Sequence, residues 1–189
     1  MNLGETRAEP RGFAAWRERK LARYPKSAEE LIVEVRDPRK LSATERAAIL
    51  ERCARANMAV YASRCGDDSD KEIARALGLQ FGLARLDPNW LADDDGISSI
   101  AVREEATRGE FIPYTSKAIR WHTDGYYNAP ERRIRAFVLH CVRGAAGGGE
   151  TQLLDHEIAY LLLRDANPDW ARALMRPDAM TIPERANGG

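Results

Sequence analysis

The chain has 189 residues, which is enough for one domain that buries a hydrophobic core of its own. Lysine plus arginine and aspartate plus glutamate both total 29, so the formal net charge is zero and bulk charge favours neither nucleic acid nor an anionic membrane as a partner. No apolar run approaches the roughly 20 residues that a membrane helix needs, and the charged N-terminus lacks the apolar segment of a secretory signal.

The cysteines indicate a reducing compartment. Cys53, Cys65 and Cys141 are odd in number and form no CxxC pair, which argues against a disulfide framework and against a thiolate zinc site. We therefore expect a cytoplasmic protein, and the balanced charge predicts neither nucleic-acid nor membrane partners. A homo-oligomer is compatible with the sequence.

The N-terminal third predicts alternating helices and strands. Residues 13–24 have helical periodicity, and we assign residues 1–30 to an N-terminal helical extension. The segment Leu-Ile-Val-Glu-Val at 31–35 predicts a strand that ends at Asp37-Pro38. A capping box at Ser42–Glu45 opens a predicted helix that runs to about Ala56.

The alternation of strand and helix continues to Gly78, and the region after it is richer in predicted strands. Residues 58–61 predict a buried strand, and Ser69 or Asp70 caps a helix that Gly78 would end. Beyond this helix the sequence predicts four strands and two helices: strands at 97–102, 118–121, 134–142 and 151–154, a helix from the cap Asp155 to about Leu163, and a helix from Pro168 to about Met175.

The sequence His122-Thr123-Asp124 carries the clearest chemical signal. Alternate residues of a strand point to the same side, so an imidazole and a carboxylate at this spacing can hold one metal ion. They would supply two of the three ligands of a facial triad, which leaves coordination positions open for oxidant and co-substrate. A histidine and an aspartate at this spacing are common by chance, so the motif depends on its surroundings.

Those surroundings resemble a known family. Trp-His-Thr-Asp-Gly at 121–125, Val-Leu-His-Cys at 138–141, and Gly-Gly-Glu-Thr at 148–151 followed by Leu-Leu-Asp resemble the taurine dioxygenase (TauD/TfdA) superfamily. The close match covers residues 112–163, and 26 residues separate Asp124 from Thr151. The Tyr126-Tyr127 pair and the segment 139–141 are similar to its gamma-butyrobetaine hydroxylase-like branch.

The resemblance implies a fold, a reaction and a set of residues. The fold is α+β, a double-stranded β-helix (jelly roll) with flanking helices. The activity is an iron(II)- and 2-oxoglutarate-dependent dioxygenase that uses O2 to hydroxylate or oxidatively cleave a small organic substrate. His122 and Asp124 would be iron ligands and catalytic residues, and the Thr151 hydroxyl would contact the 2-oxoglutarate carboxylate.

The sequence also departs from the family pattern. The family needs a second histidine as third ligand and an arginine for the far carboxylate of 2-oxoglutarate, both far beyond the threonine position, and only 38 residues follow Thr151. His140 reads as a core residue and His156 as a surface residue at a helix start. We therefore expect residues 31–189 to be an incomplete dioxygenase domain holding the N-terminal half to two-thirds of the jelly roll. We also expect the isolated chain to bind iron weakly and to be inactive.

The substrate is less determined. Tyr126, Tyr127 and Asn128 follow the ligand pair and could line a substrate pocket or form a turn beside the core. The branch resemblance favours a small amine, betaine or organic acid. A basic cluster either attracts an anionic substrate or forms a solvated face, which we favour: Arg120, Arg132, Arg133 and Arg135.

Two other functions remain open from the sequence. The first is a non-enzymatic β-helix module that binds a partner and keeps only part of the metal site. The second is a hydrolytic metal enzyme, which would retain zinc in preference to iron.

Overall fold

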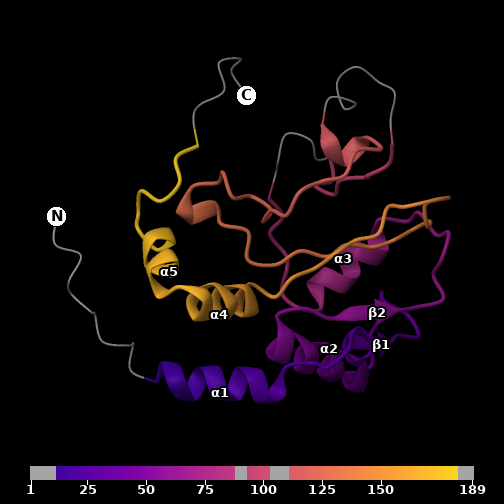
Figure 1. Cartoon of the computed structure of the whole chain (residues 1–189). Coiled ribbons are helices and arrows are strands. Elements are labelled where there is room, and N and C mark those ends of the chain that lie inside the picture. Colours follow the sequence, from indigo (N-terminus) through magenta and orange to yellow (C-terminus); the bar gives the residue numbers. More distant parts are fainter. Residues whose placement is uncertain (1–11, 88–92, 103–110, 183–189) are drawn as a thin grey trace. The chain divides into compact units, whose positions relative to one another are not determined.

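The computed structural model describes residues 12–87, 93–102 and 111–182, which form two compact units (Figure 1). Unit 1 takes the described residues up to Glu34, Thr44–Ala62 and those from Gln152 onward. Unit 2 takes Val35–Ala43 and the described part of Ser63–Thr151. Unit 1 holds most of the regular structure, and unit 2 holds the sequence motifs of the candidate site.

A strand–helix–strand unit forms one part of unit 1. Strands β1 (Ile32–Glu34) and β2 (Val60–Ala62) pair in parallel, with Ile32 opposite Val60. Parallel strands need a long crossover connection, and α2 (Ala43–Ala56) lies within it, burying Ile49 and Ala56. The 3-10 helix η1 (Ala28–Leu31) leads into β1. These bounds confirm the predicted strand, helix and strand of this region, but β2 is not buried as predicted, since Val60 is exposed and Tyr61 and Ala62 are half-buried.

Helices α1 (Phe13–Arg23), α4 (His156–Ala166) and α5 (Pro168–Leu174) form the other part of unit 1. Aromatic rings join α1 to α4, because Phe13 and Trp16 each lie 6.3 Å from the ring of Tyr160. The guanidinium of Arg164 lies over the Phe13 ring at 4.1 Å, a cation–π contact. All three helices were predicted from the sequence, and α1 is tied closely to α4.

Lys20 of α1 joins three helices through its buried ammonium group. Its Nζ lies 2.6 Å from Oδ2 of Asp155 and 2.6 Å from Oε2 of Glu157 at the start of α4. It also donates to the carbonyl oxygen of Arg55 near the end of α2, at 2.9 Å. Lys20 is 8% exposed and Asp155 is 1% exposed. A charge removed from water needs such partners.

Asp155 therefore has two structural roles. Its Oδ1 accepts from the backbone N–H of Glu157 at 2.8 Å, which makes it the N-cap of α4, as predicted. The Nδ2 of Asn57 donates to the same oxygen at 2.9 Å and to Oε2 of Glu157 at 2.9 Å. Asn57, in the left-handed region at φ 56°, thus links the end of α2 to the start of α4.

The pKa values of this network follow its contacts. Burial alone would lower the pKa of Lys20, but its hydrogen bonds to Asp155 and Glu157 outweigh burial and raise that pKa. Burial likewise favours a higher pKa for Asp155, and the bonds from Lys20, Asn57 and the Glu157 N–H bring it below its ordinary value of 3.8. Lys20 and Asp155 are therefore both charged near neutral pH.

Unit 2 has one α-helix among its described residues, α3 (Glu72–Leu79), which buries Ile73 and Leu77. Asp70 accepts from the N–H of Glu72 at 2.9 Å, as predicted for the cap. Gly78, predicted to end the helix, is buried inside its last turn, where a Cβ would lie 3.6 Å from Leu83 and 3.8 Å from Val138. Two 3-10 helices complete the unit: η2 (Ile112–Tyr114) and η3 (Pro130–Arg132).

The four later strands predicted from the sequence do not form. Residues 97–102, 118–121, 134–142 and 151–154 are described, and none belongs to a ladder. A strand requires a neighbour that accepts its backbone hydrogen bonds, and Phe137 and Leu139 are more than half exposed. The expected jelly roll is therefore not seen in the described part of this chain, whose sheet has two parallel strands.

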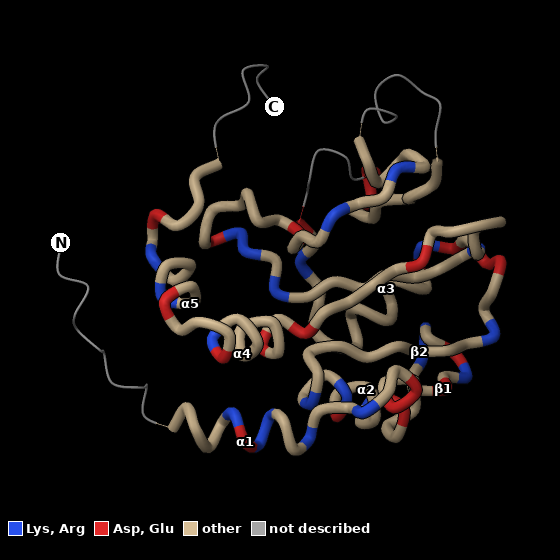
Figure 2. The backbone as a smooth tube through the Cα atoms, in the orientation of Figure 1, with Lys and Arg blue, Asp and Glu red and all other residues tan. Residues whose placement is uncertain are grey.

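The distribution of charged residues and the lengths of the helices agree with the expectations from composition. Figure 2 shows basic and acidic residues mixed along α1 and along the rest of the described chain. Among the described residues, no helix is long and apolar enough to cross a membrane.

We predict that Lys20→Met strongly destabilises the chain. The variant leaves Asp155 buried without its cation, and breaking a buried pair in this way costs about 3–5 kcal/mol. The free energy of unfolding, measured by urea denaturation followed by circular dichroism, should fall by that amount.

The matched control is Arg17→Met on the same helix. Arg17 pairs with Asp165 at 2.6 Å, with both side chains 40% or more exposed, so its loss should cost under about 1 kcal/mol. Because the Asp155 pKa is depressed, its stabilising contribution is present above pH 3.8 and is lost as the pH falls further. The cost of Lys20→Met should therefore shrink in acid. Equal costs for the two variants at neutral pH would refute the role of the buried pair.

Candidate metal site

His122 and Asp124 lie together on an exposed segment of unit 2. The Nε2 of His122 lies 3.5 Å from Oδ1 of Asp124, and their side chains are 41% and 53% exposed. Two ligand atoms about 2.0–2.2 Å from one shared divalent ion lie roughly 3.0–3.5 Å apart. The pair is thus spaced as two neighbouring ligands of a metal ion, although its segment is not part of a β-ladder.

The backbone fixes which nitrogen of His122 faces the aspartate. Nδ1 lies 2.8 Å from the carbonyl oxygen of Arg120, and a carbonyl oxygen only accepts, so Nδ1 carries the proton. In the neutral ring Nε2 then presents its lone pair toward Asp124. Metal-binding histidines are commonly held by a hydrogen bond of this kind.

The described residues place no third side chain of the usual metal-binding kinds beside His122 and Asp124. No group of three or more histidine, cysteine, aspartate or glutamate side chains that could hold a metal ion occurs among them. The other two histidines of the chain are described: His140 is half-buried and His156 is the exposed first residue of α4. Neither lies in a described metal-binding group with the pair.

The loop after Asp124 turns sharply at Gly125. Its φ is 63°, a left-handed conformation that glycine adopts without strain. Its carbonyl accepts from the N–H of Asn128 at 2.9 Å. A Cβ at position 125 would collide with Cγ1 of Ile134 and would lie 2.9 Å from Nδ2 of Asn128. The loop therefore needs glycine here for both conformation and space.

Asp87 anchors this loop from a distant part of the sequence. Its Oδ1 lies 2.7 Å from Nη2 of Arg132, and its Oδ2 accepts from Nδ2 of Asn128 at 3.2 Å. Asn128 also donates to the carbonyl of Arg132 at 3.0 Å. The hydrogen bond from Arg132, opposed by burial and aided by Asn128, lowers the pKa of Asp87. A charged Asp87 thus ties both ends of the turn.

A hollow of about 420 Å³ lies beside Asp124. Its lining comes from one continuous loop: Thr123, Asp124, Gly125, Tyr126, Asn128, Pro130, Arg133 and Ile134. Tyr126 and Asn128, two of the three predicted substrate contacts, are therefore in it. Tyr127 is not among the lining residues and packs edge-on against Tyr126, with ring centroids 5.3 Å apart.

Thr151, the predicted co-substrate contact, is exposed and does not line the hollow. It is the last residue of unit 2. The structure thus brings His122, Asp124, Tyr126 and Asn128 to one loop and leaves Thr151 outside it.

Arginines of the predicted basic cluster differ in their partners. Arg132 is paired with Asp87. Arg133 lines the hollow, and among the described residues its guanidinium has no ion pair. The hollow therefore holds one carboxylate, Asp124, and one cation that is available to a ligand. The cluster as a whole is exposed, as the sequence favoured, and Arg133 is its member beside the metal pair.

Sequence reasoning missed Asp87 and the carbonyl of Arg120. Asp87 is 41 residues from Asn128 and 45 from Arg132, so no local pattern relates them. A backbone carbonyl leaves no trace in residue type. Gly125, directly after the ligand pair, was the one sequence signal for the turn.

Comparisons with known proteins give two matches. The family described as "Taurine catabolism dioxygenase TauD, TfdA family" matches residues 19–186. A protein named uridine-5'-phosphate dioxygenase, from Amycolatopsis sp, is 39% identical over 67 residues, which are 33% of this chain and 24% of that protein. The match thus spans about a quarter of that relative's length. No solved structure matches.

We predict that Gly125→Ala distorts the loop that carries Asp124. A left-handed L-residue costs roughly 1–2 kcal/mol, and the collision with Ile134 adds to it. Binding of Mn(II), measured from paramagnetic broadening of the amide signals of residues 122–126, should weaken by about tenfold.

Gly144→Ala is the matched control. A Cβ at Gly144 meets no atom within 4 Å, and Gly144 is not among the glycines with positive φ. Mn(II) broadening should be unchanged in this variant. Unchanged broadening in Gly125→Ala would mean that the loop conformation does not position Asp124.

Proposed function

The chain belongs to the taurine catabolism dioxygenase TauD, TfdA family, and from this premise we propose that it contributes half of an iron(II)- and 2-oxoglutarate-dependent dioxygenase site. One observation carries the proposal. His122 Nε2 and Asp124 Oδ1 lie 3.5 Å apart, with the imidazole oriented by the carbonyl of Arg120. The named relative is also a dioxygenase.

In this proposal His122 and Asp124 hold the iron. Iron(II), when bound with 2-oxoglutarate, supplies O2 activation for the oxidation of a substrate C–H bond. The residues of this chain position that chemistry: Arg120 fixes the imidazole, and the Gly125 turn holds the carboxylate next to the hollow. Thr151 as the co-substrate contact rests on its spacing from Asp124 and on its hydroxyl donor.

We propose that the third ligand and the 2-oxoglutarate arginine come from polypeptide beyond these 189 residues. The two remaining histidines do not join the metal pair. The apolar segment 134–142 has no ladder partner among the described residues, and its Phe137 and Leu139 are exposed. Further strands pairing with this segment would cover that surface and build the jelly roll that the family implies.

The hollow favours an anionic substrate. Arg133, which has no ion pair among the described residues, lies in the same lining as Asp124, and a guanidinium is suited to a phosphate or carboxylate. The named relative acts, by its name, on uridine-5'-phosphate. We propose a small substrate with a phosphate or carboxylate group, which favours the organic-acid class over a simple amine.

A non-enzymatic binding module is the second candidate. The two-ligand metal pair of the described residues favours it, because an iron site held by two protein ligands is weak. The enzyme is preferred because the family match covers residues 19–186.

We predict that the longest natural reading frame containing these residues forms succinate from 2-oxoglutarate when iron(II) and substrate are present. His122→Ala should reduce succinate formation to background, because one protein ligand of the iron is lost. His156→Ala, on the exposed first residue of α4, is the control and should retain activity. Succinate formation should be screened over phosphorylated and carboxylated substrates, including uridine 5'-phosphate.

Two results would contradict this proposal. One is equal succinate formation by His122→Ala and the parent protein. The other is substrate-independent 2-oxoglutarate decarboxylation by the isolated 189-residue chain, which would mean that the described half-site is sufficient. Retention of zinc in preference to iron would favour a hydrolytic enzyme instead.

We predict that Arg133→Gln raises KM for the best anionic substrate by about tenfold, the value of one charge-assisted hydrogen bond. The turnover number should change little, because the guanidinium is proposed to bind a remote group of the substrate. Arg135→Gln, an exposed arginine outside the lining, is the control. Equal KM values for the two variants would remove Arg133 from substrate recognition.

A further inference from the structure

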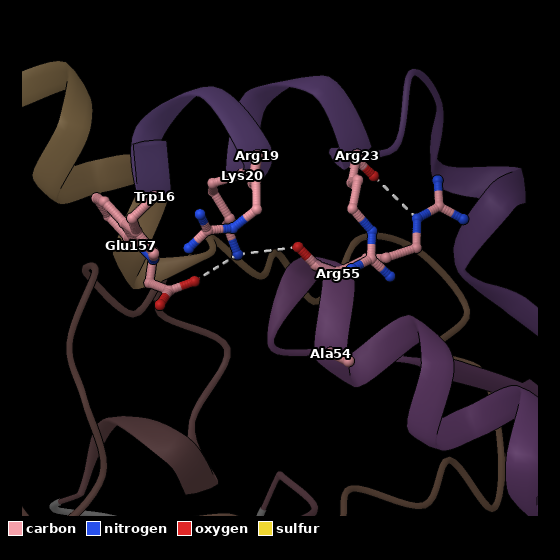
Figure 3. A pocket seen from close by; sticks show the side chains of 7 residues that line it. All are labelled: Trp16, Arg19, Lys20, Arg23, Ala54, Arg55 and Glu157. Carbon is pink, nitrogen blue, oxygen red and sulfur yellow. Dashed lines mark hydrogen bonds and ion pairs between the residues drawn. The ribbon is translucent and has the colours of Figure 1, made fainter. Parts of the chain in front are cut away.

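A second cavity, in unit 1, lies between α1 and the end of α2 (Figure 3). Its volume is about 170 Å³, well above the roughly 10–15 Å³ that one water molecule needs. Seven residues line it: Trp16, Arg19, Lys20, Arg23, Ala54, Arg55 and Glu157. Four of them are cationic and one is acidic, although the net charge of the chain is zero.

Two of the four cations are compensated by carboxylates. Lys20 uses its three N–H groups on Asp155, Glu157 and the carbonyl of Arg55. Arg55 donates to Glu30 at 2.7 Å and to the carbonyl of Arg23 at 2.9 Å. The floor of the cavity is therefore a closed polar network with no charge available to a ligand.

Arg19 and Arg23 are not compensated. Neither guanidinium has an ion pair among the described residues. They are four positions apart on α1, and Figure 3 shows the Arg23 side chain extending toward Arg55 and the Arg19 side chain toward Glu157. Like charges at this helical spacing repel each other. Arg23 lies in the last turn, where the helix dipole favours a cation, but Arg19 lies a turn earlier and has no such support.

The lining carboxylate does not cancel this charge. Oε2 of Glu157 is 2.6 Å from Nζ of Lys20 and 2.9 Å from Nδ2 of Asn57. Its charge is therefore taken up by the buried network. Arg19 and Arg23 thus bring two uncompensated guanidinium groups to the lining of one cavity, and a guanidinium can bind two oxygens of a tetrahedral oxyanion through two N–H groups.

We propose that Arg19 and Arg23 form a binding site for a phosphate group, in the cavity between α1 and the end of α2. The ligand chemistry is a phosphate dianion, either inorganic phosphate or the phosphate of a small ester. The anion relieves the repulsion between the two arginines, and their guanidinium forks hold it above the closed network of Lys20. This site lies in unit 1 and is independent of the hollow beside Asp124, which unit 2 forms.

The test is a titration of the isotopically labelled full chain with inorganic phosphate at low ionic strength, followed by amide chemical shifts. We expect saturable shifts in α1 and near Arg55, weakened by added salt because the contacts are ionic. Arg19→Gln and Arg23→Gln should each weaken phosphate binding by about tenfold. Arg133→Gln, which removes an arginine of unit 2 that also has no ion pair among the described residues, is the control and should leave these shifts unchanged.

A second arm uses uridine 5'-phosphate in place of inorganic phosphate. Shifts in α1 with both ligands support the site and show that it accepts an ester, and shifts with inorganic phosphate alone support it as a site for the free ion. If Arg19→Gln or Arg23→Gln fails to fold, Arg19→Lys and Arg23→Lys keep the charge and lose the fork, and should bind several-fold more weakly. The proposal is overturned if phosphate shifts no amide of α1, or if all variants bind phosphate as the parent does.

Discussion

Burial of the Lys20 ammonium group constrains unit 1 more than any other contact in it. A charge that is taken from water has to be met by partners of opposite charge, and Lys20 meets two carboxylates and a carbonyl that come from α4 and α2. The position of α1 is thereby fixed at the start of one helix and the end of another. The aromatic contacts of Phe13 and Trp16 with Tyr160 then follow from the same placement.

The same network explains the positive charge of the cavity beside it. Because Lys20 and Arg55 are paired with Asp155, Glu157 and Glu30, these carboxylates do not neutralise Arg19 and Arg23, which line the same cavity. In unit 2, Asp87 pairs with Arg132, and Arg133 lines the hollow beside Asp124 without an ion pair among the described residues.

The candidate metal site is set by backbone geometry as much as by its two ligands. The carbonyl of Arg120 selects the imidazole nitrogen that faces Asp124, and the left-handed turn at Gly125 allows the loop to fold back toward Ile134. Family membership supports a dioxygenase, and this geometry is the observation on which the proposed iron site depends. The exposed segment 134–142 is consistent with strands that need partners.

The sequence alone determined the family and the local elements with strong signals, and it proposed His122 and Asp124 as metal ligands. The capping residues Asp70 and Asp155, the helical periodicity of residues 13–24 and the capping box at 42–45 each depend on neighbours within a few positions, and the corresponding helices formed. The strands predicted at 97–102, 118–121, 134–142 and 151–154 depend on distant partners, and they did not form. Only the tertiary structure decided that Asp87 anchors the loop and that Lys20 is buried. It also decided that Arg19, Arg23 and Arg133 lack an ion pair among the described residues. These facts depend on contacts between residues that lie 25 to 135 positions apart in the sequence.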